Sequence, residues 1–120
     1  MRARGVAVDA LNDDLSVRSP QARLWPQTER LKAALGLASA TADAKLRARL
    51  EADAVAAADG FAQYLDMPVA GLWRDKMRAN GTFIPEVVPA SSFYHIIGAI
   101  AELADYVSRS QRELVAEKAS

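Results

Sequence analysis

His95 is the residue of this 120-residue chain best suited to acid–base chemistry near neutral pH, and it is the single histidine. It follows Ser91 and Ser92, either of which can cap a helix, so its ring is expected in the first turn of a helix. Phe93 and Tyr94 are expected to hold the ring and to limit its contact with water. A neutral imidazole there can accept a proton and return one. The competing interpretation is a packed, structural histidine.

A second segment, Arg23–Glu29, places an aromatic ring and a carboxylate around the expected start of another helix. Helix starts present free backbone N–H groups and favour negative charge, so Trp25 and Glu29 are candidates for ligand binding. The structural alternative has Trp25 packing as a hydrophobic staple and Glu29 closing a capping box.

A third segment, Gly71–Asp75, contains Trp73 and Arg74 directly before Asp75. An arginine beside an aspartate can position a polyol or a phosphate. Alternatively, the two side chains form only an ion pair beneath the indole of Trp73.

The composition argues against several classes of protein. Fifteen Lys and Arg balance fifteen Asp and Glu, so no electrostatic footprint for nucleic acid or an anionic membrane is expected. Without cysteine there are no disulfides, thiolate zinc sites or cysteine nucleophiles, and one histidine makes a metal site unexpected. No apolar run approaches the ~20 residues of a membrane span, and no signal-type apolar core follows the first residues. We therefore expect a soluble, cytoplasmic chain of one domain.

Apolar periodicity predicts an all-α chain with three main helices, near residues 26–36, 41–65 and 92–108. The first is expected to begin near Pro26 and to end at Gly36, and the second to be capped by Thr41. Asn80-Gly81 predicts one short hairpin between the second and third helices. Residues 1–22 are consistent with either a hairpin around an Asx-rich turn or a loop.

Taken together, the three segments strongly resemble the carboxy-terminal part of the N-acylglucosamine 2-epimerase family. They read RLWPQTERLKA, PVAGLWRDKMRANGTF and PASSFYHIIGAIAEL. That family also includes mannose and mannose-6-phosphate isomerases, and the first and third segments are most similar to these isomerase-like members. The resemblance covers nearly the whole chain but only the last part of the family's length. It implies that residues 1–120 are a segment of an (α/α)6 barrel built around a central sugar-binding cleft.

The resemblance also implies a chemistry. Family members interconvert sugars at C1 and C2 by proton transfer through an enediol or enolate, without a redox cofactor, so we expect no cofactor and no metal. His95 matches the family's carboxy-terminal catalytic histidine. Trp25, Glu29, Trp73 and Arg74 match motif positions near the cleft and are expected to bind substrate, a sugar or sugar phosphate.

One departure from the family limits these expectations. The second catalytic histidine of the family lies upstream, in a Glu-Pro-Gly-His type segment, and nothing like that segment is present here. Twelve helices of average length need about 130–145 residues, so three helices and a hairpin are too short to close the barrel. We therefore expect a partial chain from a truncated frame, a late start or a split enzyme.

Whether such a partial chain is an enzyme by itself stays open, although we expect it to be inactive alone. A helix face meant for missing neighbours would favour self-association or binding of a complementary upstream fragment. Two other interpretations remain: a non-catalytic helical interaction or regulatory module derived from the family, and the remnant of a degraded gene.

Overall fold

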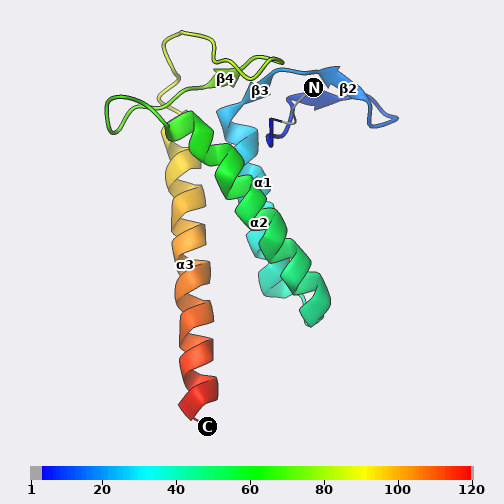
Figure 1. The fold of residues 1–120 in the computed structure, drawn as a ribbon, viewed down its shortest axis with the longest axis vertical. Coiled ribbons are helices and arrows are strands. Elements are labelled where there is room, and N and C mark those ends of the chain that lie inside the picture. The colour runs from blue at the N-terminus through cyan, green and yellow to red at the C-terminus, as the bar shows by residue number, and fades with distance from the viewer. Residues whose placement is uncertain (1–3, 120) are drawn as a thin grey trace.

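Three helices make up most of the computed structural model, which describes residues 4–119 (Figure 1). They are α1 (Leu24–Ala40), α2 (Ala44–Leu65) and α3 (Ser92–Ala119). Four short strands form two antiparallel pairs at one end of the helices: β1 (Ala10–Leu11) with β2 (Val17–Ser19), and β3 (Ala22–Arg23) with β4 (Lys76–Met77). The expected three-helix, mainly helical chain is confirmed. None of the described helices is both long and apolar enough to cross a membrane.

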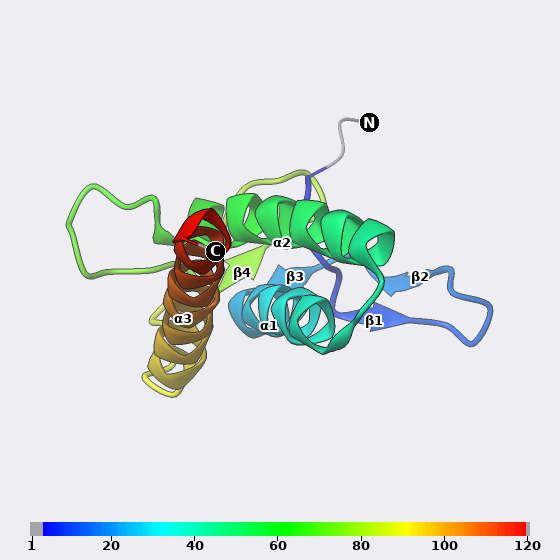
Figure 2. The same cartoon turned by 90° about the horizontal axis from the view of Figure 1, so that it is seen from below.

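Helix α1 lies at the centre of the arrangement because it packs against both α2 and α3 (Figure 2). The core lies where the three helices meet the β3–β4 pair. Its side chains come from all of these elements and include Leu24, Leu31, Leu35, Phe61, Tyr64, Met77 and Ile96. Helix α3 separates from α2 toward its carboxyl end (Figure 1). The end of the molecule that carries the strands is therefore the better packed one.

The helix boundaries differ from the sequence predictions, most of all for α3, which continues to Ala119 rather than ending near residue 108. Helix α1 runs through Gly36 to Ala40, because buried residues continue on its apolar side as far as Ala38. The cap of α2 is Asp43 rather than Thr41, since the Asp43 carboxylate accepts hydrogen bonds from the backbone of Lys45 (2.9 Å) and of Leu46 (3.2 Å).

Both expected turns form hairpins. At Asn80-Gly81 the Arg78 N–H donates to Thr82 O over 2.7 Å, and Gly81 takes the left-handed conformation (φ +87°) that suits glycine. The hairpin alternative for residues 1–22 is also confirmed, by the pairing of β1 with β2. The pairing of β3 with β4, which joins residues far apart in the sequence, was not predicted.

Two buried polar side chains fix the strand-bearing end. The Tyr64 hydroxyl donates to Ala22 O over 2.9 Å, and burial raises the pKa of that phenol. Gln27 accepts from Ala7 N and donates to Ala7 O, each over 2.8 Å. These bonds tie the start of α1 to α2 and to the amino-terminal segment.

A contact between Gly60 of α2 and the backbone of Gly5 predicts a contrast between two glycine substitutions. A Cβ at Gly60 would collide with the Gly5 carbonyl oxygen, so Gly60→Ala should cost about 1–3 kcal/mol in the free energy of unfolding. A Cβ at Gly36 meets open space, so Gly36→Ala should instead add about 0.5–1 kcal/mol through its helix preference. Urea unfolding of both variants checks this, and equal effects would contradict the contact.

Candidate active site

The structure brings His95 and Glu29 together from two helices. His95 lies in the first turn of α3, as expected, and Glu29 lies in the second turn of α1. The His95 Nδ1 is 3.2 Å from the Glu29 Oε1. Both side chains are about two-fifths exposed, which leaves the pair accessible to a ligand.

This contact determines which ring nitrogen can act as a base. A carboxylate can only accept hydrogen bonds, so Nδ1 of His95 must carry the proton that it shares with Glu29. In the neutral ring, Nε2 then holds the free lone pair. The carboxylate therefore orients the imidazole, selects its tautomer and stabilises the imidazolium once Nε2 takes up a proton.

Lys32 adds a positive charge to the same carboxylate. Its Nζ lies 3.2 Å from the Glu29 Oε1, one helical turn away. Partial burial alone would raise the pKa of Glu29, but the hydrogen bonds from Lys32 and His95 outweigh it, so this pKa is lowered. Glu29 is thus held in its charged form, and the alternative in which it closes a capping box is not observed, since α1 has no side-chain cap hydrogen bond.

One aromatic ring, that of Trp25, lies near His95, and the neighbouring aromatic residues are arranged differently from the expectation. Trp25, which is 45% exposed, lies with its ring centroid 6.1 Å from that of His95. Phe93 instead packs against Trp73, with 6.1 Å between the ring centroids. The expectation that Tyr94 would shield the imidazole is wrong, because its side chain is 83% exposed.

Trp73 and Arg74 contribute differently. The indole Nε1 of Trp73 is buried and, within residues 4–119, has no hydrogen-bond partner. The Arg74 Nε donates to the sulfur of Met67 over 3.0 Å, and its guanidinium lies 5.1 Å from the centre of the Phe83 ring. The structure thus groups Trp25, Glu29 and His95, whereas Trp73 packs against Phe93 and Arg74 contacts Met67 and Phe83.

The sequence offered Asp75 as the neighbour of Arg74, either to position a polyol or phosphate with it or to form an ion pair with it. Its side chain is 5% exposed and accepts from the Ser92 hydroxyl, with 3.5 Å between Oγ and Oδ1. Burial, together with the nearby charge of Glu86, raises the pKa of Asp75. The only sequence signal for this residue was its place directly after Trp73 and Arg74.

The raised pKa of Asp75 predicts how stability depends on pH. Between the ordinary aspartate pKa and the raised one, the native state binds this proton more fully than the unfolded state, so stability falls as pH rises. Asp75→Asn removes the charge and keeps an acceptor for Ser92. It should therefore be at least as stable as the parent at pH 7, with an advantage that shrinks toward pH 4. Urea unfolding at both pH values decides, and the opposite trend would contradict the assignment.

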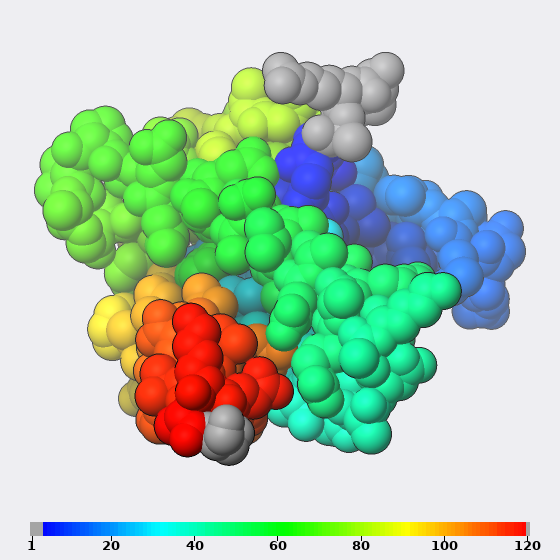
Figure 3. Space-filling view, turned by 60° about the horizontal axis from the view of Figure 1, so that its bottom comes forward, coloured from blue at the N-terminus to red at the C-terminus, as the bar shows by residue number. Residues whose placement is uncertain are grey.

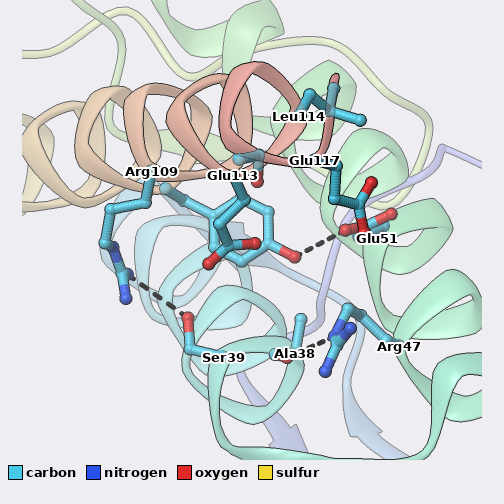
Figure 4. A pocket seen from close by; sticks show the side chains of 10 residues that line it. Ala38, Ser39, Arg47, Glu51, Arg109, Glu113, Leu114 and Glu117 are labelled. Carbon is cyan, nitrogen blue, oxygen red and sulfur yellow. Dashed lines mark hydrogen bonds between the residues drawn. The ribbon is translucent and has the colours of Figure 1, made fainter. Parts of the chain in front are cut away.

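A polar hollow of about 430 Å³ lies between the carboxyl-terminal part of α3 and the other two helices (Figure 4). Its side chains bridge the helices: Arg109 donates to the Ser39 hydroxyl over 3.3 Å, and the Tyr106 hydroxyl donates to Glu51 over 2.6 Å. Arg109 is fourteen residues beyond His95, which is about 21 Å along a helix. This hollow is therefore separate from the histidine–carboxylate pair.

An imidazole paired with a carboxylate, beside the ring of Trp25 and near the starts of two packed helices, is an arrangement that can transfer protons. The sequence profile described as N-acylglucosamine 2-epimerase (GlcNAc 2-epimerase) matches residues 2–99, which include all five predicted site residues. The chain belongs to this family of sugar epimerases and isomerases.

A curated protein of Rhizobium meliloti (strain 1021) named mannose-6-phosphate isomerase is 53% identical over 106 residues. These residues are 88% of this chain and 27% of that relative, so the chain spans about a quarter of the relative's length. No solved structure matches the chain significantly.

Proposed function

We propose that this chain supplies the catalytic-histidine segment of a carbohydrate isomerase or epimerase acting on a mannose-type sugar or sugar phosphate. The observation that carries the proposal is the contact between His95 Nδ1 and Glu29, which leaves Nε2 as a base beside Trp25. Family membership and the name of the Rhizobium relative support the choice of sugars as the substrate class.

In the proposed reaction, Nε2 of His95 takes the proton from the sugar carbon next to the carbonyl group. The electrons of that C–H bond form the carbon–carbon double bond of an enediol or enolate, and Glu29 stabilises the imidazolium. Return of a proton to the neighbouring carbon, with transfer of the hydroxyl proton from the oxygen of the original carbon to the former carbonyl oxygen, gives the ketose. Return of a proton to the original carbon from the opposite face gives the 2-epimer, which requires a second acid–base group.

Substrate binding is proposed for the groups around this base. Trp25 offers an exposed ring to the C–H face of a sugar, and the unpartnered indole N–H of Trp73 can donate to a hydroxyl. The guanidinium of Arg74 is assigned to substrate on the resemblance alone, and it would have to leave Met67 to reach a ligand.

The exposed face of α3 supports the proposal that the chain is a carboxy-terminal segment of an (α/α)6 barrel. Apolar side chains recur along this helix at spacings of three, four or seven and are 44–57% exposed: Phe93, Ile97, Ile100, Val107 and Leu114. A largely apolar groove of about 490 Å³ lies between α2 and α3 (Figure 3). We propose that a complementary upstream segment, or a second copy of the chain, covers this surface.

The isolated chain is expected to be inactive, because the proposed reaction needs acid–base groups on both sides of the sugar and the chain has one histidine. The measurement is turnover of mannose, mannose 6-phosphate and N-acetylmannosamine by stringently purified chain. Turnover that is lost in the His95→Ala variant would contradict the partial-site proposal.

A chimera tests the proposed function itself. In the Rhizobium relative, the 106 matched residues are replaced by the corresponding residues of this chain. We expect the folded chimera to isomerise the substrate of the relative, since His95 and Glu29 then complete a whole site. A folded chimera without activity would favour the second candidate, a non-catalytic interaction module, for which the exposed α3 face is the supporting observation.

A further inference from the structure

Residue 75 lies where the beginnings of α1 and α3 meet. Its backbone carbonyl accepts a hydrogen bond from the N–H of Leu24, the first residue of α1, over 2.8 Å. Its carboxylate accepts from the hydroxyl of Ser92, the first residue of α3, over 3.5 Å. These two helix starts carry the acid–base pair, Glu29 on α1 and His95 on α3.

The surroundings of the Asp75 carboxylate leave Ser92 as its hydrogen-bonding side chain within residues 4–119. Three charged groups influence it, Glu86, Lys76 and Arg23. Lys76 pairs with Glu86 at 3.3 Å, and Arg23 pairs with Asp9 at 3.2 Å, so both cations are engaged by other carboxylates. Burying a carboxylate without a cation of its own is costly, and the hydrogen bond from Ser92 offsets only part of this cost.

We propose that Asp75 is a positioning residue that holds the first turns of α1 and α3 together and thereby sets the contact between Glu29 and His95. Its backbone fixes the start of α1 and its side chain fixes the start of α3. That Asp75 positions the two helices does not depend on the proposed function, whereas its importance for turnover rests on that function. Loss of the Asp75 carboxylate lets α3 shift relative to α1, so Nδ1 of His95 loses its acceptor.

The single histidine makes a direct test feasible in the full chain. The ¹⁵N chemical shifts of the imidazole, recorded at mildly alkaline pH, report whether Nδ1 or Nε2 carries the proton. The parent chain is expected to show mainly the Nδ1–H tautomer. Asp75→Ala should shift the population toward Nε2–H, and Asp75→Asn, which keeps an acceptor for Ser92, should restore the parent tautomer.

Two controls separate positioning from general loosening and from the proposed function. Tyr64→Phe removes a buried hydrogen bond to Ala22 at the same end of the molecule and removes no hydrogen bond to α3, so it should leave the tautomer unchanged. Glu29→Ala removes the acceptor itself and should shift the tautomer fully. An unchanged spectrum in Glu29→Ala would overturn the acid–base pair and with it the proposed function.

Separate results would contradict the positioning role of Asp75. If Glu29→Ala shifts the tautomer and a folded Asp75→Ala does not, Asp75 does not position the pair. If Tyr64→Phe shifts it as much as Asp75→Ala, the effect is general loosening, and the inference is also wrong. Should Asp75→Ala not fold, Ser92→Ala decides, because it removes the donor to Asp75: a shift supports the inference and a parent-like spectrum overturns it.

Discussion

Replacing His95 with asparagine should lower the turnover of the chimera with the Rhizobium relative by at least ~100-fold, the size of effect expected for loss of a positioned acid–base group. Asparagine fits the same space but cannot take up a proton at Nε2. Stability should change little, within about 0.5 kcal/mol, because the His95 side chain is 41% exposed.

Initial rates and thermal unfolding of the same preparations check the two parts of this prediction. A variant that keeps near-normal turnover and unfolds early would make His95 a structural residue. The site assignment would then be wrong even though the family assignment stands.

Glu29→Ala should reduce the turnover of the chimera by about 10–100-fold, as for other carboxylates that orient a functional histidine. Without the carboxylate, Nδ1 of His95 has no acceptor and the imidazolium loses its counter-charge. The matched control is Lys32→Ala, since Lys32 contacts the same Glu29 oxygen but is not a partner of His95 in any described contact.

The control should change turnover only a few-fold, because Glu29 stays ionised near neutral pH without Lys32. Equal losses in the two variants would mean that Glu29 acts through the charge cluster as a whole. No loss in Glu29→Ala would show that the pair has no part in catalysis.

Local sequence signals predicted the elements better than their ends. The apolar periodicity of residues 41–65 and 92–108 identified α2 and α3. In α3 only part of the periodic stripe is buried, since Ile96 is buried but Ile97 and Ile100 are about half exposed. Gly36 suggested a helix end, but Leu31, Leu35 and Ala38 bury the same side of α1 on both sides of it. Their packing outweighs the roughly 1 kcal/mol that an interior glycine costs.

The site was predictable as a set of residues and not as an arrangement. His95 stood out as the single histidine, but its contact with Glu29 joins positions 66 residues apart and depends on how α1 and α3 pack. The proposed role of Asp75 could not be predicted for the same reason, since its hydrogen-bond partners Leu24 and Ser92 are distant from it in the sequence. Tyr94 was placed wrongly because its direction depends on which face of α3 meets α1.

Incorporation of solvent deuterium is the most direct test of the proton transfer proposed for His95. The chimera is incubated with mannose 6-phosphate in D₂O, and the ketose product is examined by NMR for deuterium at C1. We expect deuterium at C1, because a proton held on an exposed imidazole exchanges with solvent, and we expect His95→Asn to form little product. Ketose formed without deuterium, or labelled ketose formed at the parent rate by His95→Asn, would contradict proton transfer by this histidine.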